Sequence, residues 1–291
     1  MAAVEFKVDG NIAVVTLNRP EARNAVSPEV AVRLAKAWEE IKSNDQIRVA
    51  VLTGEGEKAF SAGADLGRLI PLFSGGREPE DEWDHAVMDD PKITNKALLR
   101  DFDTVKPVIA AVNGHAIAGG LELVQGTDIR ISVPEARFGV QEVKWAIFPA
   151  GGSTVRLPAQ LPYAKAMELL LTGDLITADE ALDFGFLNYV VSKEKLLSKA
   201  FEIAEKISSN GPLAVKAIRK SARLCIGLTE EEGMKVETKL SAPVFKTEDA
   251  REGPKAFLEK RAPVYKGRCR VKSSKLRRSC CNGRLQSGGK N

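Results

Sequence analysis

Two short stretches rich in alanine and glycine are the part of this chain best suited to meet a ligand through the backbone. Residues 59–66 read AFSAGADL and residues 113–122 read NGHAIAGGLE, so the second stretch ends in a glutamate. Glycine inside a regular element costs about 0.5–1 kcal/mol relative to alanine, and a sequence shaped only by packing would carry larger side chains here. We therefore expect exposed backbone N–H groups at these two places.

In each stretch an apolar strand is predicted to end and the chain to turn into a helix. The N–H groups of a first helical turn have no partner within the helix and lie at the positive end of its dipole, which favours an anion. If N–H groups of both stretches meet, they can hold a carbonyl oxygen and stabilise the negative charge of an enolate or tetrahedral intermediate. Taken alone, either stretch is more typical of close packing between a helix and a sheet.

The elements that would position these stretches can be followed along the chain. Residues 4–17 alternate apolar and polar positions around an Asp-Gly pair, which predicts a β-hairpin. Ser27 followed by Pro28 predicts the start of an amphipathic helix. Short apolar strands that run into turns are predicted at residues 49–52, 108–112 and 128–133. Strand, turn and helix thus repeat at irregular spacing, in place of an array with a fixed period.

The C-terminal part has a different pattern. After residue 151 the sequence predicts mainly helices, at residues 163–171, 177–184, 193–208, 212–224, 230–240 and 247–259. Residues 67–104 are interrupted by glycine, proline and acidic residues and are interpreted as a partly helical excursion beside the site. This segment is interpreted either as a lid over the site or as an ordinary surface insertion.

Composition and charge limit the class of protein. The chain has 291 residues, of which 44% are hydrophobic, enough for one large domain or two small ones. The sequence shows no apolar run of about 18 residues and no leader at its start, which favours a soluble cytoplasmic protein without membrane contact. Three of its four cysteines lie after residue 268, so no disulfide framework or zinc-ligand spacing is present and a reducing compartment fits.

The basic charge is concentrated at the C-terminus. Eight of the 43 Lys and Arg residues and none of the 39 Asp and Glu residues lie in residues 268–291, so the rest of the chain carries a formal charge of −4. That tail has too few apolar residues to form a core, and its composition predicts disorder. A remnant without function is the favoured interpretation, and contact with nucleic-acid phosphates is the alternative.

Several separated strings connect the chain to a known family. The strings are KAFSAGADL, KPVIAAVNGHAIAGGLEL, ARFGVQEVKWAIFPAGGSTVRLP and LLTGDLITADEALDFGFLNYVV. In this order they resemble the enoyl-CoA hydratase, or crotonase, family, and the likeness runs from about residue 4 to 267. It implies an α/β fold: a crotonase-like spiral of ββα units over residues 1–190 that carries the active site. A helical trimerisation region over residues 191–267 would follow, and the tail of residues 268–291 lies outside the likeness.

The same resemblance implies the site residues. It places the oxyanion donors on the N–H groups of Ala62 and Gly119, and two catalytic glutamates on Glu122 and Glu142. Hydratases of the family use both glutamates, whereas isomerases commonly keep one. Water that adds to a conjugated double bond must lose a proton while the α-carbon gains one, so an acid and a base within about 3 Å are needed. The pair favours hydration of a 2-enoyl-CoA, with an isomerase or another crotonase-type acyl-CoA enzyme as the alternative.

The resemblance also implies how the substrate binds. The CoA part of the substrate would lie along two backbone segments, Ala22 with Arg23 and the run Ala64, Asp65 and Leu66. Arg23 or Arg68 is a candidate partner for phosphate. Trp145, one turn after the second glutamate, is expected to bound the acyl pocket, and His115 to be a packed or capping residue.

Family members imply the remaining properties of the protein. They work without a metal or redox cofactor, since CoA enters as part of the acyl-CoA substrate, and they assemble as homotrimers, often paired into hexamers. The alternative to an enzyme is a crotonase homologue that binds RNA through its basic tail. We favour this alternative less, and so expect no nucleic-acid partner.

Overall fold

The computed structural model describes residues 1–268. The chain divides into two compact units, the first of which is Met1–Glu205 and the second of which begins at Lys206. The first unit therefore extends past residue 190, where the spiral was predicted to end, and takes in most of helix α9 (Lys193–Ser208). Residues 269–291, which make up nearly all of the predicted basic tail, lie outside the described residues.

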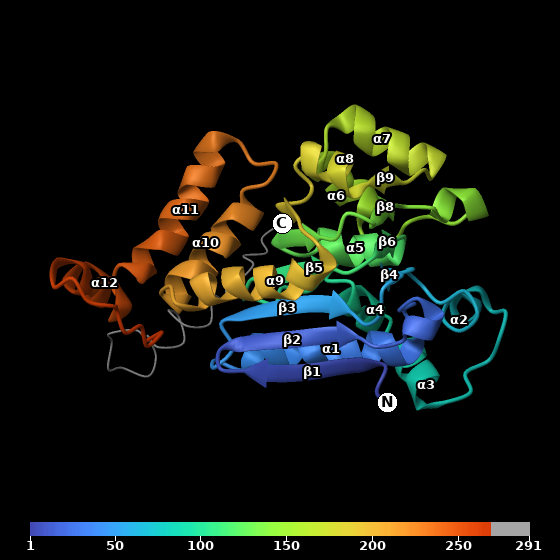
Figure 1. The fold of residues 1–291 in the computed structure, drawn as a ribbon, viewed down its shortest axis with the longest axis horizontal. Coiled ribbons are helices and arrows are strands. Elements are labelled where there is room, and N and C mark those ends of the chain that lie inside the picture. The colour runs from blue at the N-terminus through green and yellow to red at the C-terminus, as the bar shows by residue number, and fades with distance from the viewer. Residues whose placement is uncertain (269–291) are drawn as a thin grey trace, which may run out of the picture. The chain divides into compact units, whose positions relative to one another are not determined.

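The first unit is built on a mixed six-stranded sheet (Figure 1). Strands β1 (Val4–Asp9) and β2 (Ile12–Leu17) pair antiparallel and confirm the predicted hairpin, with Gly10 at φ +56° in its turn. Parallel strands then follow β2 in the order β3 (Val49–Gly54), β5 (Val108–Val112), β7 (Ile129–Ser132) and β10 (Tyr189–Val190). Strands β3 and β5 are buried along almost their whole length, which explains why they read as continuous apolar runs.

A second sheet carries the small-residue stretches. Its strands lie in the order β4 (Ala59–Ser61), β6 (His115–Ile117), β8 (Arg137–Gly139) and β9 (Ile176–Thr177). Strands β3, β5 and β7 of the first sheet are each followed along the chain by a short strand of the second sheet. The repeat predicted as strand, turn and helix is thus strand, turn, short strand and helix, and it winds the chain through both sheets.

Helix α1 (Pro28–Ser43) links the first sheet to the predicted excursion. The hydroxyl of Ser27 caps its N-terminus by accepting the N–H of Val30, as the Ser-Pro pair predicted. Trp38 is fully buried, and its indole N–H donates to the carbonyl of Ala97 at 3.0 Å. The excursion itself contains α2 (Ile70–Ser74), α3 (Glu82–Asp89) and α4 (Lys92–Ala97), of which α3 and α4 pack on α1. Residues 67–104 are therefore partly helical, as predicted.

The remaining helices of the first unit surround the second sheet. They are α5 (Gly119–Gln125), α6 (Ser153–Gln160), α7 (Tyr163–Thr172) and α8 (Ala178–Asp183), with 3-10 turns η1 (Pro20–Ala22) and η2 (Glu142–Trp145). Helix α5 contacts β4, β6 and α6, so it lies where the second sheet meets the helices.

The second unit is helical in the residues that the structure describes. Its helices are α10 (Pro212–Leu224), α11 (Glu230–Val244) and α12 (Asp249–Leu258), which confirms the predicted helical C-terminal part. Helices α10 and α11 pack on each other, and the side chain of Asp249 accepts the N–H groups of Lys266 and Gly267. Across residues 1–268 no helix has both the length and the apolar character needed to cross a lipid bilayer.

Candidate active site

The two small-residue stretches lie directly against each other. Gly63 has φ +86°, and a Cβ atom on it would come within 2.8 Å of the Gly119 nitrogen. A Cβ atom on Gly119 would lie 3.5 Å from the nitrogen of Ala64. Gly63 is therefore required by the close approach of the two backbones, Gly119 lies in ordinary contact with Ala64, and the predicted meeting of the stretches is present in the fold.

The free N–H group of the first stretch belongs to a different alanine from the one that the sequence indicated. The N–H of Ala62 donates to the carbonyl of Arg23 at 3.0 Å, so the expectation that it faces a ligand is wrong. Ala64 has no acceptor for its N–H within residues 1–268. Gly63 lies between the two alanines at positive φ, so the extended backbone is interrupted there and the two N–H groups serve different purposes. The direction of these groups depends on this turn, which the residue types alone do not reveal.

The second stretch offers the amide of Gly119. Ala118 precedes it at φ +54° and ψ −128°, a strained conformation for a residue with a side chain. The N–H of Ala118 donates to the carbonyl of Gly139 at 2.9 Å, whereas that of Gly119 has no acceptor in the described part of the chain. A Cβ atom on Gly120 would come within 2.3 Å of the Ser61 carbonyl oxygen, so the first turn of α5 is in direct backbone contact with β4. Two free amides, on Ala64 and Gly119, thus lie side by side.

Glu122 lies one turn into α5 and is 3% exposed. The N–H of Ser153 donates to its Oε1 at 3.1 Å. A Cβ atom on Gly151 would lie only 2.1 Å from its Oε2, so the carboxyl group occupies the space beside that glycine. Burial raises the pKa of Glu122, while hydrogen bonds from Ser153 and Gly151 and the charge of Arg156 act in the opposite direction.

Glu142 begins the turn η2, and its side chain has a different environment. Its Oε2 atom is buried without a hydrogen-bond partner among the described residues. Burial, with a smaller contribution from the negative charge of Glu122, raises the pKa of Glu142 to about 7, against the opposing effect of the hydrogen bond from its own backbone N–H. The charge of Glu122 is among the causes of this shift, and the placement of both glutamates against one substrate stays a prediction.

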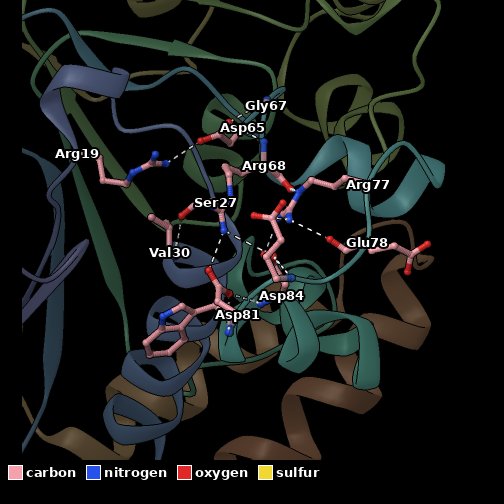
Figure 2. Close-up of polar contacts among 12 residues, drawn as sticks. Arg19, Ser27, Val30, Asp65, Gly67, Arg68, Arg77, Glu78, Asp81 and Asp84 are labelled. Carbon is pink, nitrogen blue, oxygen red and sulfur yellow. Dashed lines mark hydrogen bonds and ion pairs between the residues drawn. The ribbon is translucent and has the colours of Figure 1, made fainter.

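The residues predicted to contact CoA lie on the segments next to the free amides. Ala22 ends η1, Arg23 follows at φ +53° with an exposed side chain, and Leu66 is 62% exposed. The carboxylate of Asp65 is occupied within the protein, because it pairs with Arg19 at 2.9 Å and accepts the N–H groups of Gly67 and Arg68, as Figure 2 shows. Binding of CoA along these residues stays a prediction.

Two further side chains that the sequence singled out can now be placed. His115 is exposed on β6, so it is not a packed residue as expected; partial removal of water around the ring, followed by the positive charges of Arg137 and Arg23, lowers the pKa of His115. Trp145 ends η2 and is 70% exposed, on the same turn as Glu142. Its position is compatible with the predicted edge of an acyl pocket.

An ion-pair cluster that sequence reasoning did not find joins the excursion to the Asp65 segment (Figure 2). Arg68 pairs with Asp81 at 2.8 Å, so it is occupied and does not stand free for phosphate. Asp84 is fully buried and pairs with Arg77 at 2.7 Å, and it also accepts the N–H of Glu80. In the sequence, the pattern that indicates this cluster is the run of acidic residues before α3 together with the two arginines that precede it.

Metal ligation has no support among residues 1–268, where no group of three or more His, Cys, Asp or Glu side chains is arranged to hold an ion. The expectation of a reaction without metal or redox cofactor stays a prediction.

Two sheets that the chain winds through, a helical C-terminal unit and unpaired amides on Ala64 and Gly119, one turn before the buried Glu122, match an α/β enzyme scaffold of the crotonase type. The sequence profile of the enoyl-CoA hydratase/isomerase family matches residues 7–268, and the chain belongs to this family.

Relatives and solved structures agree with that assignment. The chain is 44% identical over 274 residues to an enoyl-CoA hydratase from Mycobacterium tuberculosis, EchA19, covering 92% of this chain and 100% of that protein. It is 39% identical to an (E)-benzylidenesuccinyl-CoA hydratase from Thauera aromatica, covering 91% and 99%. The crystal structure of an enoyl-CoA hydratase from Bacillus anthracis superposes with a TM-score of 0.83 at 35% identity, covering 91% of this chain and 100% of that one. The predicted crotonase-like fold is confirmed.

Proposed function

We propose that the protein catalyses the reversible addition of water to a 2-enoyl-CoA thioester, giving a 3-hydroxyacyl-CoA. The observation that carries this proposal is the buried Glu122 one turn after the unpaired amide of Gly119, together with the raised pKa of the half-buried Glu142. Family membership and the hydratase names of the relatives support it.

The free amides of Ala64 and Gly119 are suited to hold the thioester oxygen. Two N–H donors aimed at this oxygen stabilise the negative charge that grows on it as the enolate forms. Withdrawal of electrons toward the oxygen makes the β-carbon electrophilic. The proposed donor pair is therefore Ala64 with Gly119, whereas the sequence led us to expect Ala62 with Gly119.

The two glutamates divide the proton transfers because their hydrogen bonds differ. Glu122 receives donors from Ser153 and Gly151, which favour the ionised carboxylate, whereas Oε2 of Glu142 has no donor in the described structure. We assign Glu122 as the base that takes a proton from the attacking water and Glu142 as the acid that protonates the α-carbon. A C–O bond forms at the β-carbon, and the reverse sequence eliminates water.

The first experiment follows loss of the conjugated thioester absorbance with a panel of short, long and aromatic 2-enoyl-CoA esters. An aromatic ester belongs in the panel because one relative is named for a benzylidene acyl group. Incorporation of oxygen from ¹⁸O-labelled water into the product separates hydration from isomerisation, which moves a double bond without adding solvent oxygen. Absence of label with every ester would exclude the proposed reaction.

Substitution of each glutamate tests the assigned residues. Glu122→Gln and Glu142→Gln should each slow hydration at least about a hundredfold, because each removes one proton transfer, while thioester binding stays largely intact. Glu135→Gln, at an exposed position, is the control for loss of one carboxylate and should leave the rate unchanged. Full activity of either site variant would rule out the two-carboxylate mechanism.

A further inference from the structure

The free amide of Ala64 takes its direction from a single bridge to a neighbouring loop. Val26 and Ala64 form an isolated parallel β-bridge. The N–H of Val26 donates to the Gly63 carbonyl at 2.8 Å, and the Val26 carbonyl accepts the N–H of Asp65 at 3.0 Å. The Gly63 carbonyl and the Ala64 N–H belong to one planar trans peptide group, so they point in opposite directions. Because the carbonyl faces Val26, the N–H of Ala64 points away from Val26.

One bridge is weak support for a group that must be aimed accurately. Strand β4 ends at Ser61, so the residues around Ala64 lie beyond it and are not held by a continuous ladder. A group that stabilises charge in a reaction must be held within about 0.5 Å of its productive place. A second link between the two segments would therefore improve the aim of the amide.

Arg19 supplies a second link, and Figure 2 shows its contact with Asp65. Its Nη1 atom donates to the carbonyl of Ala25 at 2.8 Å and to Oδ2 of Asp65 at 2.9 Å. Ala25 and Asp65 are the chain neighbours of the two bridged residues. One guanidinium nitrogen therefore joins both segments directly beside the bridge.

The loop that carries Arg19 is itself fixed to β4. Asn24 is buried, and its Nδ2 amide donates to the carbonyl of Ala59 at 2.9 Å. The hydroxyl of Ser61 donates to the Asn24 carbonyl at 2.9 Å, and the backbone N–H of Arg19 donates to Oδ1 of Asn24 at 2.9 Å. Arg19 thus extends from an anchored loop toward the less supported residues after Gly63.

We propose that Arg19 and Asp65 form a positioning pair that holds the Ala64 amide in the direction from which it meets the thioester oxygen. The inference rests on the proposed function, because that function supplies the oxygen. Neither side chain touches a reacting atom, so both are positioning residues. The Asp65 carboxylate serves this contact within the protein, and the backbone beside it is left to the substrate.

The test uses Asp65→Asn, Arg19→Met and the double variant. Asp65→Asn is the milder change, because its amide oxygen can still accept the N–H groups of Gly67 and Arg68, which now bond to Oδ1. Loss of a whole oxyanion donor costs about 100- to 1000-fold in kcat, so misdirection of one should cost about 10- to 100-fold with KM within about threefold. The double variant should equal Arg19→Met, because the two residues act through one contact. Additive losses would overturn the pair.

A matched control removes another half-buried ion pair. Glu29 pairs with Arg33 at 2.6 Å within α1, shortly after the loop that carries Arg19. Glu29→Gln should leave kcat unchanged, since it does not alter the link to Asp65. If Asp65→Asn behaves like Glu29→Gln, the positioning pair is refuted, and this comparison stands even if Arg19→Met does not fold.

Infrared spectroscopy reports on the amide without turnover. The probe is butyryl-CoA labelled with ¹³C at its carbonyl carbon, a saturated thioester that cannot be hydrated; if a longer ester reacts faster, its saturated counterpart is used. Hydrogen bonds to a carbonyl lower its stretching frequency, so binding to the native chain should lower it. Asp65→Asn and Arg19→Met should return the band toward its position in free thioester. Affinity for the matching S-alkyl-CoA thioether, which has no carbonyl, should stay unchanged, whereas general damage to the segment would weaken it.

The two measurements separate failure of the pair from failure of the proposed function. If the variants lose the frequency shift while the native chain hydrates no ester, the positioning pair stands and the hydratase proposal fails. An undiminished shift in the variants of a chain that hydrates its substrate would refute the pair alone. Absence of any shift in the native chain would refute the pair together with the assigned amide donors.

Discussion

Glu122 and Glu142 are the same side chain placed in two different hydrogen-bond environments. Glu122 is met by the donors of Ser153 and Gly151, and Glu142 keeps one buried oxygen without a partner in the described structure. Because burial raises the pKa of both groups, the donors decide which carboxyl releases its proton first. The hydrogen-bond donors around each carboxyl group, and not the residue type, therefore decide which of the two glutamates is ionised.

The raised pKa of Glu142 predicts a stability effect with a definite sign. A carboxyl group whose folded pKa is about 7 and whose unfolded pKa is near 4.5 imposes no penalty below about pH 4.5. As the pH rises from about 4.5 to 7 the unfolded chain releases this proton and the folded chain does not, so the folded state loses stability across that range and no more above it. Glu142→Gln should therefore match the native chain near pH 4 and exceed it above pH 7, by up to about 3 kcal/mol.

Urea denaturation at a series of pH values measures this difference. Glu135→Gln, which removes an exposed carboxylate, should show no comparable pH-dependent gain. Parallel stability curves for the native chain and Glu142→Gln would mean that the carboxyl group titrates normally.

At the scale of elements, the contact between α5 and the start of α6 sets the geometry of the site. A Cβ atom on Gly151 would come within 2.1 Å of Glu122 Oε2 and 2.8 Å of Leu98 Cδ1. Gly151→Ala should therefore displace the carboxyl group, lowering kcat at least about tenfold and destabilising the fold by about 1–3 kcal/mol through overpacking.

Enzyme kinetics and thermal unfolding check this prediction against Gly67→Ala. A Cβ atom on Gly67 would meet only Asp65 Oδ1 at 3.5 Å, an ordinary contact, so the control should keep both activity and stability. Equal behaviour of the two variants would show that the carboxyl group has room to move.

Helix α3 is held by charge in addition to apolar contacts. Asp84 is fully buried, and although burial pushes its pKa upward, the hydrogen bond from Arg77 and the backbone donor of Glu80 lower it overall. Asp84→Asn should destabilise the first unit by about 3–5 kcal/mol, because it leaves the Arg77 guanidinium without its buried partner.

Limited proteolysis of the excursion, residues 67–104, and urea denaturation test this effect. Asp89→Asn changes an exposed carboxylate near the end of the same helix and should be close to neutral. If Asp84→Asn were equally neutral, the ion pairs would not be what holds the excursion.

At the scale of the whole molecule, the end of the described chain offers a clean point for truncation. The N–H of Glu248 donates to the carbonyl of Arg268 at 3.1 Å, and Asp249 accepts the N–H groups of Lys266 and Gly267. Removal of residues 269–291 keeps these contacts, so we expect unchanged hydration and unchanged thermal stability.

The same truncation tests the alternative role in nucleic-acid binding. A gel-shift titration with single-stranded RNA at several salt concentrations should give no tail-dependent affinity. Salt-sensitive binding that disappears with residues 269–291 would establish the alternative instead. The predicted assembly of three or six chains is measured by sedimentation of both forms.

Much of this protein could be predicted from the sequence because short-range patterns carry the information. The Asp-Gly pair fixed the first hairpin, Ser27 with Pro28 fixed the start of α1, and the C-terminal helices follow the apolar spacing. Glycine at positions 63, 120 and 151 reflects close approach of backbone to backbone or carboxyl, which only a residue without a side chain permits.

Only the tertiary structure decided which groups face one another. The exchange of Ala62 for Ala64 as the free amide depends on Arg23, which lies far away in the sequence and captures one of the two N–H groups. The cluster around Asp84, and the contact that Ser153 makes with Glu122, likewise join distant segments. Residue types determine what chemistry is available, whereas hydrogen-bond partners across the fold determine which atoms are left free to perform it.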